Sequence, residues 1–285
     1  MPKLFTVTEQ KLITRWIELS TLQCGSGSSR KVLALHGWLD NAASFLPLAP
    51  LLNDLELVAL DLPGHGHSDH RPPGQHYHFV DFVEDVIGAA DELGWGQFIL
   101  LGHSMGAGIA SLIAASFPER IEKLILIEGL GPWGDNPAEA PRHLAEATRQ
   151  ILSLNTKRTQ HYPREEDAVA ARMKAGDLGE HSAQLLVSRN TIKDDQGISW
   201  RTDPRLRLRS PIYLTEEQAQ AFLTNIAVPT LFIRDAKREV PSHYNWDVRE
   251  KLIKELQIVA LSGGHHLHME NPQAVANTIN KFLEN

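Results

Sequence analysis

Short apolar runs alternate with helical stretches over the first half of the chain, and this rhythm limits the folds open to it. The runs lie at residues 32–35, 57–60, 98–101 and 124–127, and each ends at a polar residue or a glycine. Residues 79–93 carry apolar side chains at helical spacing, and residues 105–117 are expected to form the next helix. Strands that are apolar on both faces and separated by single helices predict a parallel sheet covered by helices.

The same rhythm returns near the end of the chain. Apolar runs at 229–233 and 258–261 predict two more strands, with helices expected near 244–256 and at 272–283. An early strand is expected at residues 15–19. The predicted fold class is therefore α/β, with a doubly wound, mostly parallel sheet.

Residues 132–225 interrupt this pattern. The segment is polar and contains prolines at positions 137, 141, 163, 204 and 211. Its clearest helix start is Thr215 to Gln218, where a hydroxyl and an amide three residues apart can satisfy free N–H groups. The segment is too long for a plain loop. We predict a helical cap at 132–225, inserted into a core formed by residues 1–131 and 226–285.

Composition and charge exclude several classes of protein. A hydrophobic content of 42% allows a large core, and a net charge of −7 gives no field that would gather phosphates, so nucleic-acid binding is not expected. No apolar run approaches the roughly 20 residues of a membrane span, and the start lacks a signal-peptide pattern, so a cytoplasmic protein is expected. The single cysteine, Cys24, excludes an intramolecular disulfide and is expected in a hairpin loop at residues 24–30. Oligomeric state stays open.

The strand at 98–101 leads into Gly102-His-Ser-Met-Gly106, which matches the pattern G-x-S-x-G. In this pattern a serine lies on a strained turn between a strand and a helix. Glycines on either side of the serine let neighbouring backbone pass close to the turn. The bare pattern arises easily by chance, but here it follows a buried strand and precedes a small-residue helix. We therefore predict that Ser104 is a nucleophile.

At this point the chain resembles the α/β-hydrolase family. The resemblance covers about residues 30–127 and 228–283. It is carried by His36-Gly-Trp-Leu-Asp-Asn-Ala-Ala-Ser-Phe45, Asp61-Leu-Pro-Gly-His-Gly66, the serine turn and Gly264-His265. The first of these stretches and Asp203-Pro-Arg-Leu206 are similar to the serine-hydrolase-like group. The resemblance implies a Ser–acid–His triad in that chain order, a small-molecule substrate and no cofactor.

His265 directly follows Gly264 and takes the position of the family's histidine, so we predict that it is the base; His266 and His268 are expected to pack in the loop and helix start. The acid departs from the family pattern, because the usual position falls on Arg238. Asp235 and Glu239 lie nearby. Glu128, at the end of the strand after the serine's, is the other candidate, as in some relatives. A carboxylate that ends an apolar strand needs a partner, and a catalytic histidine would provide one. We favour Glu128, with Asp235 as the alternative.

The oxyanion hole is expected from two backbone N–H groups, that of Met105 after the nucleophile and that of Trp38 after the strand at 32–35. The Trp38 side chain is expected to pack or line the pocket. Trp133 is a second candidate for a pocket wall, with packing inside the cap as the alternative.

The stretch Gly64-His-Gly-His-Ser-Asp-His70 also fits a zinc-binding pattern. Paired prolines at 72 and 73 follow it, however, and they hold the backbone extended where that motif normally enters a helix. We therefore interpret these histidines as polar loop residues, one of which could contact substrate, and predict no metal.

The leading hypothesis is a serine hydrolase that cleaves a carboxylic ester or related acyl bond through an acyl-enzyme. A carbon–carbon bond hydrolase using the same serine and a non-catalytic small-molecule binding protein of the same fold are the alternatives. The sequence names no substrate.

Overall fold

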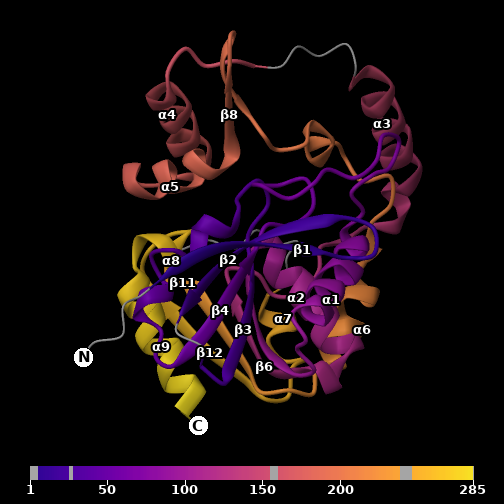
Figure 1. Cartoon of the computed structure of the whole chain (residues 1–285). Coiled ribbons are helices and arrows are strands. Elements are labelled where there is room, and N and C mark those ends of the chain that lie inside the picture. Colours follow the sequence, from indigo (N-terminus) through magenta and orange to yellow (C-terminus); the bar gives the residue numbers. More distant parts are fainter. Residues whose placement is uncertain (1–5, 26–27, 155–159, 238–245, 285) are drawn as a thin grey trace.

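The computed structural model describes residues 6–25, 28–154, 160–237 and 246–284 (Figure 1). An eight-stranded sheet in the order β1-β2-β4-β3-β5-β6-β11-β12 forms its centre. The strands are β1 (Val7–Ile13), β2 (Glu18–Gly25), β3 (Arg30–Leu35), β4 (Leu55–Leu60), β5 (Phe98–His103), β6 (Ile121–Ile127), β11 (Thr230–Asp235) and β12 (Leu256–Leu261). All neighbours from β4 to β12 pair in parallel, and β2 runs antiparallel to both β1 and β4. The predicted mostly parallel sheet is confirmed.

The start of the chain differs from the expectation. Residues 15–17 lie in the turn of a β1–β2 hairpin, so the strand expected at 15–19 begins only at Glu18 and continues to Gly25. Strand β1 escaped detection because it lies at the sheet edge with six of its seven residues exposed, and so has no apolar run. Cys24 is a buried residue of β2, and burial raises the pKa of its thiol to about 11. Because β4 lies between β2 and β3, the hairpin loop expected at residues 24–30 is wrong.

Helices cover both faces of the sheet (Figure 1). One face packs against α1 (Phe82–Glu92), α2 (Met105–Ser116), α6 (Glu216–Thr224) and α7 (Trp246–Arg249), and the other against α8 (Leu267–Glu270) and α9 (Pro272–Glu284). Strand residues alternate between the two layers as the pleat requires: Leu33 and Leu35 face the first, Val32 and Ala34 the second. The doubly wound arrangement is confirmed. In the described part of the helix expected near 244–256, only α7 is helical; Tyr244 lies outside the described residues.

The 132–225 segment holds several further elements. They are β7 (Gly134–Asp135), α3 (Ala140–Ser153), α4 (Glu165–Gly176), α5 (Glu180–Asn190), β8 (Thr191–Asp194), β9 (Gly197–Trp200) and β10 (Leu214–Thr215), followed by α6. Figure 1 shows α3, α4, α5 and β8 together beyond one end of the sheet, whereas α6 lies beside the core helices. The expected capping box is present, with Thr215 and Gln218 each accepting from the other's backbone. The division into core and cap stays a prediction.

A buried ion pair joins this segment to the sheet. Asp61, directly after β4, accepts hydrogen bonds from the Arg189 guanidinium on α5, with the closest N–O distance at 2.8 Å. The Asp61 side chain is fully buried, and its oxygens also accept from the backbone N–H groups of Ala42 and His67. Asp61 therefore fixes two core loops and α5 at a single point.

Candidate active site

Ser104 lies on the sharp turn between β5 and α2, with φ 52° and ψ −113°. A side chain at Gly106 would collide with the carbonyl oxygen of Leu35, and one at Gly102 would collide with the backbone of the α2 start. The two glycines therefore let the turn sit directly on β3 and α2. The Ser104 N–H donates to the carbonyl of Ile127 at 2.8 Å, which ties the turn to the end of β6.

His265 reaches Ser104 from the loop after β12. Its Nε2 lies 3.0 Å from Ser104 Oγ, and its Nδ1 lies 3.1 Å from Glu128 Oε2. Three residues from three strand ends thus form one chain of contacts at the carboxyl edge of the sheet.

The two candidate acids have different partners. The Glu128 side chain is fully buried; Oε2 faces the histidine ring, and Oε1 accepts from the Asp235 N–H at 2.6 Å. The Asp235 carboxylate instead accepts from three backbone N–H groups, those of Lys237, Gly263 and Gly264, at 3.1 to 3.2 Å. Asp235 therefore holds the loop that carries His265, and Glu128 contacts the ring itself. Arg238 and Glu239 lie outside the described residues.

A cavity of about 1290 Å³ opens above these residues. Ser104, His265 and Trp38 line it from the core, and Tyr162, Arg172 and other side chains of the 132–225 segment line it from the opposite side. The hydroxyl of Ser104 is therefore within reach of a small molecule.

A family model described as the alpha/beta hydrolase fold matches residues 31–272. This chain belongs to the α/β-hydrolase family. A serine hydrolase-like protein of Danio rerio is 31% identical to this α/β hydrolase, covering 97% of the chain and 88% of that protein. A serine hydrolase-like protein of Mus musculus is 32% identical, over 97% of the chain and 96% of its own length.

Solved structures show the same likeness. The crystal structure of a hypothetical protein from Pseudomonas aeruginosa PAO1 is 40% identical, with a TM-score of 0.93 over 97% of this chain and 99% of that one. A thioesterase domain from the curacin biosynthetic pathway is 28% identical, with a TM-score of 0.85 over 96% of this chain and 99% of that one. The protein is thus a serine hydrolase-like α/β hydrolase. No helix within the described ranges is long and apolar enough to cross a membrane.

The two predicted oxyanion donors belong to elements that meet at Ser104. Trp38 follows Gly37 in the loop after β3, and Met105 is the first residue of α2, whose first N–H groups have no partner inside the helix. The Trp38 side chain lines the cavity, as expected, and its Nε1 donates to the carbonyl of Leu206 at 2.9 Å. Trp133 is about half exposed and is not among the residues lining this cavity, so its expected place as a pocket wall is wrong.

The histidines of residues 64–70 have separate partners in this α/β hydrolase. His67 pairs with Glu9 at 2.7 Å, and His70 bonds the carbonyl of Arg201 at 2.8 Å and lines the cavity. His65 lies in the loop after β4, as expected, but it is fully buried, and burial lowers its pKa to about 3. The side chains therefore do not share a centre. Among the described residues, the donor atoms that converge closely enough for one ion belong to Asp40, His103 and His266.

Asp40 was not among the site residues predicted from the sequence, although it lies in the stretch His36 to Phe45 that carries the family resemblance. The Asp40 side chain is almost fully buried and bonds both Arg172 of α4 and His266, the residue after His265. The local signal was an aspartate in the loop after an apolar strand, four residues past His36. Its partners lie more than 100 residues away, so that signal could not identify them.

Proposed function

We propose that this α/β hydrolase cleaves carboxylic esters or related acyl bonds, including thioesters, through an acyl-enzyme formed on Ser104. The observation that carries the proposal is the 3.0 Å contact between Ser104 Oγ and His265 Nε2, backed by Glu128 at the other ring nitrogen. The cavity above the serine supports a small acyl substrate. The thioesterase domain among the similar structures supports the inclusion of thioesters.

The hydrogen bonds of His265 support Nε2 as the nitrogen that acts as the base. A carboxylate only accepts, so His265 Nδ1 carries a proton and donates it in a hydrogen bond to Glu128 Oε2, and Nε2 keeps a free lone pair toward Ser104. His265 Nε2 removes the hydroxyl proton as Oγ attacks the acyl carbon, and Glu128 stabilises the imidazolium that forms. Asp235 acts as a positioning residue because its three backbone contacts hold the histidine loop.

The developing oxyanion needs donors on the other side of the acyl carbon. The N–H groups of Trp38 and Met105 fill this role, and each is worth about 3 to 4 kcal/mol of transition-state stabilisation. The protonated His265 then gives its proton to the leaving group, and the acyl group remains on Ser104. A water molecule gives a proton to the same nitrogen as it attacks the acyl-enzyme, and His265 returns that proton to Ser104 Oγ as the acid is released.

A fluorophosphonate probe tests this proposal directly. The protein is expected to take one probe molecule on Ser104, because the contact with His265 raises the nucleophilicity of the hydroxyl. Mass spectrometry of the labelled peptide identifies the site. The Ser104→Ala variant, checked for an unchanged melting temperature, is expected to remain unlabelled.

Two results would overturn the enzyme proposal: an unlabelled wild-type protein, or equal labelling of Ser104→Ala. Either would favour a non-catalytic binding protein. Labelling of Ser104 without turnover of a panel of esters and thioesters would contradict the acyl-bond assignment and favour the carbon–carbon bond hydrolase.

A further inference from the structure

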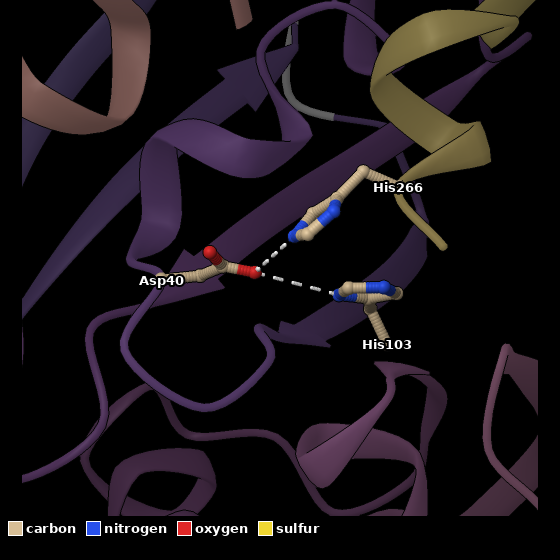
Figure 2. A group of neighbouring side chains, drawn as sticks. All are labelled: Asp40, His103 and His266. Atoms are coloured by element: carbon tan, nitrogen blue, oxygen red, sulfur yellow. Dashed lines mark hydrogen bonds and ion pairs between the residues drawn. The ribbon is translucent and has the colours of Figure 1, made fainter. Parts of the chain in front are cut away.

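A second group of titratable side chains, Asp40, His103 and His266, lies close together (Figure 2), and the rings of its two histidines lie beside that of His265. Asp40 follows β3, His103 immediately precedes Ser104, and His266 immediately follows His265. All three are buried, with exposed fractions of 1%, 0% and 5%. One donor atom from each lies within 4.8 Å of the others. The proposed mechanism gives none of them a step.

The contacts of His103 fix its protonation. Its Nε2 lies 2.8 Å from the carbonyl oxygen of His265, which can only accept, so Nε2 carries a proton. A neutral imidazole carries one ring proton. Nδ1 is therefore a bare lone pair, and it has no hydrogen-bond partner in the described part of the chain.

That lone pair faces a carboxylate. His103 Nδ1 lies 3.7 Å from Asp40 Oδ2. Asp40 also bonds Arg172 and His266, and an ionised carboxylate can accept both bonds. Two electron-rich atoms thus face each other away from solvent, an arrangement that a cation between them would stabilise.

The spacing of the donor atoms suits a transition metal. Asp40 Oδ2 lies 3.2 Å from His266 Nε2, beside the 3.7 Å to His103 Nδ1. Tetrahedral Zn²⁺ with bonds of about 2.0 to 2.1 Å holds its ligand atoms about 3.3 Å apart, and two imidazoles with one carboxylate form a known zinc donor set. The 3.2 Å distance already fits this spacing, the 3.7 Å distance must shorten by about 0.4 Å, and the donor atoms of the two histidines lie within 4.8 Å of each other.

Gly37 keeps room for such an ion. A side chain at this position would place its Cβ 2.9 Å from both Asp40 Oδ2 and His103 Nδ1. Any residue other than glycine at position 37 would place a side-chain atom beside Asp40 Oδ2 and His103 Nδ1. Gly37 leaves that space open.

The outer contacts also match those of metal ligands. A metal-bound histidine usually donates its other N–H to a carbonyl or carboxylate, as His103 Nε2 does toward His265. Asp40 Oδ1 accepts from Arg172, which leaves Oδ2 toward the histidines. Asp40 and His266 line the active-site cavity, which supplies an entry path and room for a water as fourth ligand. The Arg172 charge lowers the affinity for a dication and so favours reversible binding.

We propose that Asp40, His103 and His266 form a three-ligand site for a divalent transition metal, with Zn²⁺ as the best-fitting ion, and that the bound ion inhibits the hydrolase. Zn²⁺ takes the place of the proton between Asp40 and His266. Inhibition follows because the His265 ring lies 4.9 Å from that of His103 and 5.2 Å from that of His266. A dication there opposes the positive charge that His265 must accept. Only the inhibitory half rests on the proposed function.

Metal binding is tested apart from catalysis on Ser104→Ala protein purified without a histidine tag. Isothermal titration with Zn²⁺ is expected to give one ion per chain, and Co²⁺ is expected to give the visible absorption of a tetrahedral site. Removing an outer partner of a metal ligand costs about 10- to 100-fold in affinity, so removing a ligand itself is expected to cost at least about 100-fold. Asp40→Asn and His266→Gln should each show this loss in that background.

The matched control is His181→Gln, which removes an exposed histidine of α5 and is expected to leave the affinity unchanged. Circular dichroism confirms that each variant is folded, and two independent ligand replacements guard against a misfolded one. Absence of binding, or binding that survives both ligand replacements, would overturn the metal site.

The inhibitory half is tested on wild-type protein with an ester substrate. Zn²⁺ is expected to lower turnover over the concentration range in which it binds, and excess chelator is expected to restore it. Binding by the three residues with unchanged turnover would overturn the inhibitory role. A protein that Ser104 probes do not label but that binds Zn²⁺ would contradict the proposed function alone.

Discussion

Replacement of Glu128 by glutamine is expected to lower the kcat for ester hydrolysis by about 10⁴, the loss known for the equivalent change in a serine protease triad. The glutamine side chain keeps the shape but presents no negative charge to His265. The ring can therefore adopt the other tautomer, in which Nδ1 carries the lone pair and Nε2, which faces Ser104, carries the proton. The fully buried carboxylate also ceases to offset the charge on the imidazolium. Steady-state kinetics with a chromogenic ester measures the loss.

Asp235→Asn is the matched control for that change. Asparagine keeps an oxygen that can accept from the N–H groups of Gly263 and Gly264, so the histidine loop should hold and turnover should fall far less. Melting temperatures of both variants separate lost catalysis from lost folding. A larger fall in turnover for Asp235→Asn than for Glu128→Gln would refute the assignment of the acid.

Replacement of Arg189 by methionine is expected to lower the free energy of unfolding by about 3 to 5 kcal/mol, because it leaves the Asp61 carboxylate buried without its cation. The Asp61 side chain has no exposed surface, and two backbone N–H groups remain as its partners. Urea denaturation, followed by circular dichroism, measures the change in midpoint.

Arg164→Met provides the comparison. Arg164 pairs with Asp167 in the same way, but both side chains are exposed, so solvent already stabilises each charge and little change is expected. Equal destabilisation by the two replacements would show that burial of the Asp61 pair does not matter.

The sequence predicted the central strands because they are apolar on both faces. β3 to β6 and β11 leave few side chains to solvent, so each appears as an apolar run. β1 and most helices of the 132–225 segment could not be recognised in the sequence. They bury few side chains, and some of the side chains that they do bury are polar. α3, for example, buries only His143 and Ala147 among its residues, and a buried histidine leaves no apolar spacing to detect.

Local pattern predicted Ser104 and His265 as site residues, but it could not choose between Glu128 and Asp235. Both carboxylates follow apolar strands, and those strands, β6 and β11, are neighbours in the sheet. Their carboxyl ends therefore reach the same edge, and only the direction of each side chain distinguishes them. That direction depends on the loop that carries His265, which lies in another part of the sequence.

The backbone conformations of Ser104 and Glu128 bear on the proposed catalytic mechanism. Ser104 and Glu128 both have positive φ angles, 52° and 56°, where a side chain costs about 1 to 3 kcal/mol and glycine would cost little. A protein that only needed to stay folded would gain by relaxing both turns. This chain keeps an oxygen-bearing side chain at both of these positions, and in the proposed mechanism the two side chains are the nucleophile and the acid, so the strained backbone would be retained for their chemistry.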